Sequence, residues 1–199
     1  MTAAMVTAAL EATAAKIKPK DEKPFCRGDA VVYPTHGVGR IDRVGFEDVA
    51  GCRLDLIHIS FEDNQMTLRI PVAQARAAGL RNLATPTALT AALAILKGRP
   101  RVSRLMWAKR SQDYLAKINT SHPEALAQVI RDLQPTGASP DRSFSQRNLF
   151  ELALDRLAAE FAAVNRITKP RAAEQLNQTL LAARANSVAE RQLCANVDS

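Results

Sequence analysis

The sequence is poor in cysteine and in aromatic residues. Its 199 residues include three cysteines, and only 5% of the side chains are aromatic, with a single tryptophan. Cys26, Cys52 and Cys194 stand at no spacing that zinc ligands use, and an odd number of cysteines without a secretion signal indicates reduced thiols. The sequence therefore predicts a cytoplasmic protein without structural zinc.

Motifs for catalysis or for membrane insertion are also missing. The three histidines, His36, His58 and His122, have no cysteine or paired carboxylate arranged around them, and no GxxxxGK[ST] phosphate loop is present. The Ala- and Thr-rich start is interrupted by Glu11 and lacks the basic residues of a signal peptide. We therefore expect a protein that is not an enzyme, that needs no cofactor and that has no membrane segment.

Positive charge is concentrated in one stretch. The chain carries a formal net charge of +7, and Trp107 lies in the middle of the stretch that supplies most of it. Between Lys97 and Lys117, seven basic residues and one acid give +6, namely Lys97, Arg99, Arg101, Arg104, Lys109, Arg110, Lys117 and Asp113. Lys and Arg bind phosphates without reading base sequence, so this stretch predicts a contact with nucleic acid.

Trp107 allows two interpretations. A helix is expected to start after Ser103, whose hydroxyl could cap its first turn, and Arg104 and Arg110 would then flank Trp107 on one face. An apolar ring between guanidinium groups can enter an unstacked base step from the minor groove. The ring could equally be a core residue, because Tyr114 continues its face. Spacing alone does not separate these alternatives.

Charge and periodicity divide the chain into two folded parts. Residues 24–83 contain seven basic and seven acidic residues, whereas residues 84–181 contain fourteen basic and eight acidic ones. The first part alternates with the period of strands, and the second has the period of helices. The sequence predicts an α+β protein, with a small Tudor- or SH3-like β-barrel followed by an all-α helical bundle. Residues 1–23 and 182–199 are expected to be flexible extensions.

The strand signal is clearest at Met66 to Val72, where the even-numbered residues are apolar and Thr67 and Arg69 point away from them. Together with its neighbours it predicts four or five short strands in a small open barrel. Aromatic residues here could form a cage for a methylated lysine, but core packing is the simpler interpretation. The residues concerned are Phe25, Tyr33, Phe46 and Phe61.

The helical part is marked by caps and by apolar stripes. Thr85 and Pro86 predict one helix start, and the segments Ser121 to Glu124 and Ser143 to Gln146 resemble capping boxes. The last helix opens at Pro170, and its periodicity is expected to end near Leu181. A bundle face is predicted from Phe150, Leu154, Leu157, Phe161 and Val164. Four arginines could either enlarge the basic face or be solvated, namely Arg142, Arg147, Arg156 and Arg166.

Four segments resemble a known family in their order and spacing. They are GDAVVYPTHGVGRID (Gly28 to Asp42), MTLRIPV (Met66 to Val72), WAKRSQDYLAKI (Trp107 to Ile118) and VIRDL (Val129 to Leu133). Over about residues 24–181 the chain is similar to the CarD/CdnL transcription regulators of bacteria, whose barrel also occurs in the transcription-repair coupling factor. The resemblance implies a monomer with a Tudor-like domain that binds the RNA polymerase β subunit.

The resemblance also implies a DNA-binding role for the helical domain. It would contact promoter DNA nonspecifically, in the minor groove at the upstream edge of the transcription bubble, and stabilise the open complex. Trp107 matches the family's wedge tryptophan, Lys109 and Arg110 match the basic pair after it, and Arg101 and Arg104 would add phosphate contacts. The alternative is an interaction module on polymerase without a wedge.

Three residues are implied for the polymerase contact. Arg69 matches a polymerase-contacting arginine of the family, and Thr67 shares its exposed face. Glu47 occupies a position that is basic in some members, so the strength of this contact is open.

Overall fold

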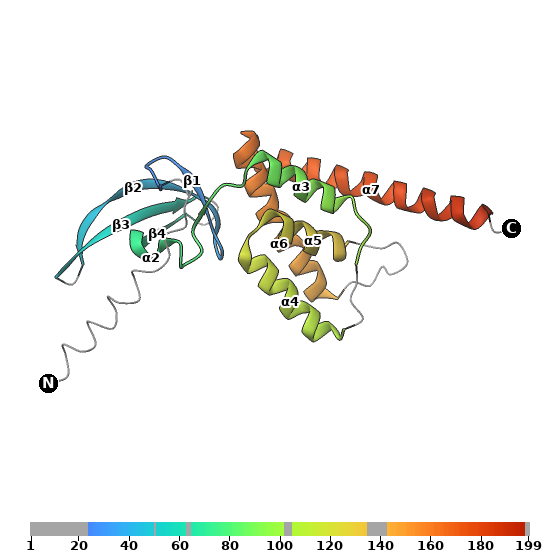
Figure 1. Ribbon diagram of the computed structural model, residues 1–199, viewed down its shortest axis with the longest axis horizontal. Helices are drawn as coiled ribbons and strands as arrows, with labels where there is room; N and C mark the ends of the chain where they lie inside the picture. The colour runs from blue at the N-terminus through green and yellow to red at the C-terminus, as the bar shows by residue number, and fades with distance from the viewer. Residues whose placement is uncertain (1–23, 50, 63–64, 102–104, 135–142, 198–199) are drawn as a thin grey trace.

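Alternating apolar and polar residues fold the first part of the chain into an antiparallel sheet (Figure 1). The computed structural model describes residues 24–49, 51–62, 65–101, 105–134 and 143–197. The strands lie in the order β4-β3-β2-β1-β5, so the sheet is open and β4 is one of its edges. The strands are β1 (Ala30–Tyr33), β2 (Gly37–Val49), β3 (Cys52–Phe61), β4 (Met66–Pro71) and β5 (Arg81–Asn82).

The inward face of the sheet holds the first hydrophobic core. The short helix α2 (Val72–Ala75) follows β4 and contributes Ala75 to this core. Gly39 of β2 lets the core close, because a Cβ atom there would lie 2.7 Å from side-chain atoms of both Ile59 and Phe61. The core consists of Val31, Ile41, Ile57, Ile59, Phe61, Ile70, Ala75 and Leu80.

Most of the strand predictions are confirmed. Thr67 and Arg69 are exposed on β4, while Ile70 is buried. The prediction that Phe46 is a core residue is wrong, because its side chain is 65% exposed and stacks under the guanidinium of Arg53 at 5.1 Å. The pairing register explains this, since the β2–β3 hairpin continues past both neighbouring strands at the level of Phe46.

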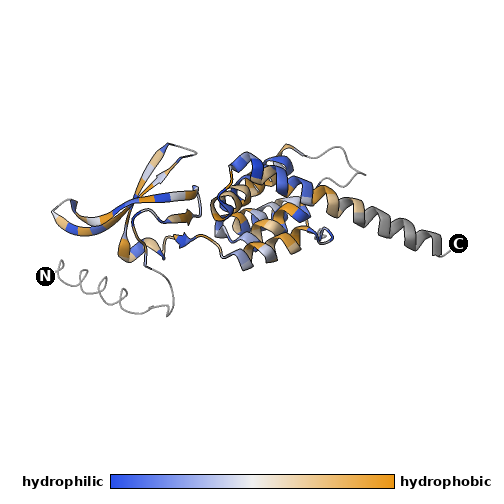
Figure 2. Cartoon of the chain, turned by 90° about the horizontal axis from the view of Figure 1, so that it is seen from above, coloured by the Kyte–Doolittle hydropathy of each residue, from blue (hydrophilic) through white to orange (hydrophobic). Residues whose placement is uncertain are grey.

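The second part of the chain is a helical bundle, which confirms the predicted α+β architecture. Its core is built from α3, α4, α5, α6 and α7, and the end of α7 extends beyond the other helices (Figure 1). In the sheet of the first part, by comparison, hydrophobic and hydrophilic residues alternate along the strands (Figure 2). The helices span Pro86–Leu96 (α3), Trp107–Thr120 (α4), Pro123–Asp132 (α5), Phe144–Asn165 (α6) and Lys169–Val197 (α7).

Two predicted helix caps are confirmed and two are wrong. The hydroxyls of Thr85 and Ser143 accept hydrogen bonds from first-turn amides of α3 and α6. Helix α4 starts at Trp107 with Met106 as its N-cap, not after Ser103, and residues 102–104 lie outside the described residues. Ser121 does not cap α5, since it ends α4 in the left-handed conformation with φ 54° and His122 is the N-cap of α5.

The last two helices differ in detail from the prediction. On α6 the buried face is centred on Leu149, Ala153 and Leu157, and the predicted Phe150 and Phe161 pack only at its margin. Three of the buried residues on α6 are alanines, namely Ala153, Ala158 and Ala162. Helix α7 continues to Val197, beyond the point near Leu181 where the apolar periodicity of the sequence ends.

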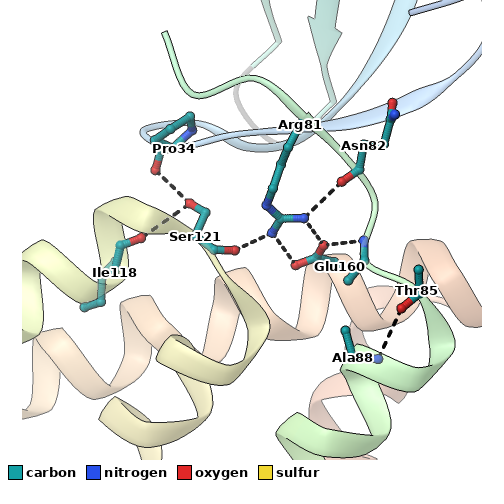
Figure 3. A network of polar contacts seen from close by, with 9 residues as sticks. Pro34, Arg81, Asn82, Thr85, Ala88, Ile118, Ser121 and Glu160 are labelled. Carbon is teal, nitrogen blue, oxygen red and sulfur yellow. Dashed lines mark hydrogen bonds and ion pairs between the residues drawn. The ribbon is translucent and has the colours of Figure 1, made fainter. Parts of the chain in front are cut away.

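A buried ion pair joins the sheet to the bundle (Figure 3). Arg81 of β5 donates two hydrogen bonds to the Glu160 carboxylate on α6, at 2.6 and 2.9 Å. The same carboxylate accepts a bond from the amide of Ala84 at 2.9 Å, and Arg81 also donates to the carbonyl of Ser121. Glu160 is only 1% exposed, so these donors compensate its charge where water cannot.

The turn between β1 and β2 makes a second contact with the bundle. Arg156 of α6 donates to the carbonyls of Pro34, Thr35 and Ile118. The Ser121 hydroxyl also donates to the Pro34 carbonyl, at 3.3 Å. Burial lowers the pKa of the Arg156 guanidinium, and the three carbonyls offset that cost as acceptors. Arg156 therefore belongs to the domain interface, and the prediction that it extends the basic face or is solvated is wrong.

Candidate functional site

Trp107 is the first residue of α4, and its ring is partly buried. The Arg110 guanidinium lies 5.5 Å from the ring centroid, one turn further along, which is within reach of a cation–π contact. The Tyr114 ring lies at 6.5 Å and is tilted by 49°. The ring packs against the helical core and is only partly covered, so the structure is compatible with both interpretations of Trp107.

One basic group, Arg110, lies over this ring, and others are its neighbours in sequence. Lys109 and Arg101 are exposed, and Arg110 is partly buried, with an Nε atom that has no hydrogen-bond partner within the described residues. A hollow of about 340 Å³ beside Tyr114 is lined by four basic residues and two acids, namely Arg101, Arg110, Lys117, Arg131, Asp113 and Asp132. Of the residues predicted to bind DNA, the structure brings together Trp107, Arg110, Lys109 and Arg101, and Arg104 lies outside the described residues.

The start of α4 is open to an anion. Among the residues that the structure describes, no side chain caps this end, and its first turn contains no acid. The Met106 carbonyl accepts from the amides of Lys109 and Arg110, both at 3.1 Å, so the amides before them stay outside the helical pattern. A helix start of this kind attracts a phosphate oxygen, and Lys109 adds charge next to it.

Charged side chains also meet on the outer face of the sheet. Glu47 forms an ion pair with Arg43, and its carboxylate lies 3.9 Å from the Arg69 guanidinium and 3.2 Å from His58 Nε2. His58 stands opposite Arg69 in the register, and Ser60 stands opposite Thr67. The three predicted polymerase-contacting residues, Arg69, Glu47 and Thr67, thus lie on β2 and β4, with β3 between them.

The positive charges of Arg43 and Arg69 exceed the single negative charge of Glu47 in this cluster. Burial, followed by the charges of Arg43 and Arg69, holds the pKa of His58 below its ordinary value, so that its imidazole is neutral near pH 7. Arg69 remains 66% exposed, and its contact with Glu47 is long. Glu47 therefore reduces the positive charge of this face without removing it.

The domain interface contains residues that the sequence did not single out. Arg81 and Glu160 were assigned no role, and Ser121 was assigned to a cap. No local pattern marks them, because their partners lie 79 and 87 residues away in the chain. The one signal in the sequence that could have pointed to this interface is Glu160, because it is an acid within the apolar stripe of a helix.

Other kinds of site find no support in the described part of the chain. None of its helices combines the length and the hydropathy of a bilayer-spanning segment. Within the same residues, no three His, Cys, Asp or Glu side chains are grouped so that they could hold a metal ion.

Two protein families match adjacent parts of the chain. Residues 25–84 match the CarD-like/TRCF RID domain, and residues 91–177 match the CarD C-terminal domain. The chain belongs to the CarD family. The transcription-factor candidate YdeB of Bacillus subtilis (strain 168) is 25% identical to this CarD-family protein over 145 residues, which cover 73% of the chain and 95% of YdeB.

A solved structure is also similar to part of this chain. The 72-residue N-terminal domain of Myxococcus xanthus CarD is 28% identical, with a TM-score of 0.27, and the match covers 34% of this chain and 93% of that one. As a member of the CarD family, this protein is a transcription-related regulator that interacts with RNA polymerase. Its two matched domains are of a regulatory, non-enzymatic kind.

Proposed function

We propose that this protein binds the RNA polymerase β subunit through the outer face of its sheet and stabilises the promoter open complex through α4. In this proposal the start of α4 contacts DNA in the minor groove, at the upstream edge of the bubble. The DNA contact is nonspecific, and the protein acts as a monomer. The observation that carries the proposal is the partly exposed Trp107 ring, held by Arg110 beside the basic Lys109.

The ring and the charges suit two different parts of DNA. Lys109, Arg101 and Arg110 would replace counterions on the phosphates, which gives salt-dependent affinity without base recognition. The accessible edge of Trp107 would then lie against an unstacked base step. Arg110 and Tyr114 restrict the ring, so less side-chain freedom is lost on binding.

The sheet offers a matching surface for polymerase. Strand β4 is an edge, so its outer backbone groups can pair with a strand of a partner. The exposed Thr67 and Arg69 side chains stand beside that edge. We infer a contact in which a strand of polymerase pairs with β4, and an acidic residue of polymerase lies next to Arg69.

Docking makes a weak DNA contact effective. When the sheet is bound to polymerase, the bundle is confined near the promoter, and its effective concentration there exceeds that of the free protein. If α4 binds the open promoter better than the closed one, the open state gains population and lifetime without any chemical step. This differential binding accounts for regulation by a protein with no operator of its own.

Open-complex lifetime tests this proposal directly. With the cognate polymerase on a short-lived promoter, the protein should lengthen the lifetime, Trp107→Ala should lose most of that effect, and Trp107→Phe should keep part of it. Both variants should still bind polymerase in a pull-down. An unchanged lifetime with Trp107→Ala would exclude the wedge role.

An interaction module without a wedge is the second candidate function. The packing of Trp107 against Tyr114 and the helical core favours it. In that case Trp107 fluorescence would be the same with and without promoter DNA on the polymerase complex. The lifetime would then not change, although polymerase binding would remain.

A further inference from the structure

We propose that Met106, and not Trp107 alone, forms the leading edge of the DNA wedge. In this arrangement the methionine side chain enters the base step first, and the indole of Trp107 closes in behind it. The inference rests on the proposed DNA contact of α4 and assigns a role to a residue that no sequence motif marked. It concerns the same surface, at its outermost point.

Exposure is the first observation that separates the two residues. Met106 is 83% exposed, the highest fraction among the large apolar side chains in the described part of the chain. Trp107 is partly buried and belongs to the margin of the helical core. An apolar side chain this exposed loses solvent contact only when a partner covers it, so Met106 has the most to gain from insertion.

Mechanical freedom is the second observation. Trp107 contacts Arg110 and Tyr114, and a deep insertion of its ring would have to break both contacts. Met106 is 83% exposed and carries three rotatable bonds and a polarizable sulfur, which let it fit an irregular gap. Methionine is among the apolar side chains that architectural proteins insert between base pairs.

The backbone holds Met106 in the right place for this role. It is the N-cap of α4, with φ −57° and ψ 147°, so its side chain precedes the first helical turn. Its carbonyl accepts from the amides of both Lys109 and Arg110, which fixes the backbone while the side chain is exposed to solvent. Leu105, which is 45% exposed, adds apolar surface on the preceding residue. A fixed backbone beside basic groups places a flexible apolar tip where phosphates guide the surface onto DNA.

The test compares full-length variants at position 106 in the open-complex lifetime assay. Met106→Ala and Met106→Gln should each reduce the lifetime gain about tenfold. This factor corresponds to the lower end of the free energy that burial of such a side chain contributes. Met106→Leu should keep most of the gain, because it preserves the apolar volume. Each variant should bind polymerase and unfold at the same temperature as the wild type, since Met106 is so exposed.

Phe144→Ala provides the matched control. Phe144 is also strongly exposed and is the first residue of another helix, α6, so its loss should leave the lifetime unchanged. If Met106→Gln lengthens the lifetime as much as the wild type does, the leading role of Met106 is wrong, and the wedge rests on Trp107. If the wild type itself gives no gain, the proposed function and the wedge role of Met106 are both wrong.

Discussion

At the scale of single residues, Glu47 changes the charge that the outer face of the sheet offers to polymerase. Its carboxylate lies among Arg43, Arg69 and a neutral His58, so the three charged groups sum to one positive charge. An exposed ion pair as long as that between Arg69 and Glu47 contributes little. Arg69 therefore stays available to a partner despite the neighbouring acid.

Reversing the charge of Arg69 should abolish docking. Arg69→Glu would place two carboxylates close together and repel an acidic partner surface, so we expect polymerase to be lost in a pull-down. Arg53→Glu is the matched control, because Arg53 stacks on Phe46 on the other side of the hairpin. Retained binding by Arg69→Glu, or equal loss by both variants, would exclude the assigned contact.

Residue patterns singled out Trp107 but did not predict its environment. The one tryptophan within a basic stretch was compatible with a contact or a core role, and in the structure the ring lies partly exposed at the margin of the core. The ring position depends on whether Tyr114 packs beneath it, which local spacing allows but does not require. Met106 escaped notice because it stands between Leu105 and Trp107, and no period in this apolar run marks one of the three as exposed.

At the scale of elements, the starts of helices show what local sequence can specify. Thr85 and Ser143 were predicted correctly because each cap is a bond within four residues. Ser121 matched the same pattern, but its hydroxyl bonds to Pro34, far away in the chain, and its backbone adopts a left-handed conformation. Helix α4 starts without a side-chain cap, so a search for capping residues misplaced it.

The sheet core should be sensitive to one methyl group on β2. Gly39→Ala would bring a Cβ atom within 2.7 Å of Ile59 and Phe61, and overpacking of this kind should reduce the free energy of unfolding by about 1–3 kcal/mol. Urea unfolding followed by circular dichroism measures the change. Gly45→Ala on the same strand is the control, because its Cβ atom meets nothing within 4 Å. Equal stability of the two variants would contradict the close packing of Phe61 on Gly39.

At the scale of the whole molecule, composition predicted two domains but not how they meet. Charge partition and periodicity separated the sheet from the bundle because these are properties of long segments. The contact between the domains depends on three charged side chains, Arg81, Arg156 and Glu160, whose partners are set only by the folded chain. Arg156 in particular has nearby acids in sequence, yet it binds backbone carbonyls across the interface.

Removing the charge of Glu160 should destabilise the protein and loosen the two domains. For Glu160→Gln we expect a loss of about 2 kcal/mol, below the usual cost of breaking a buried pair because Arg81 is 20% exposed. Asp155→Asn is the control, since Asp155 pairs with Lys169 on the surface and is 59% exposed. The midpoint of urea unfolding measures both. A loss with Glu160→Gln no larger than with Asp155→Asn would show that the pair does not join the domains.

The two sides of the domain interface should also differ in how well they tolerate substitutions. Arg156 and Ser121 hold the β1–β2 turn by its main-chain carbonyls, at Pro34 and Thr35. A carbonyl oxygen is supplied by every amino acid, so the side chain of Thr35 can vary without removing an acceptor. The α6 side chains that make these contacts cannot vary in this way, because Arg156 is the donor and Glu160 is the buried acid. Sequence drift in the turn should therefore leave the relative orientation of the domains unchanged, whereas drift at Arg156 or Glu160 should alter it.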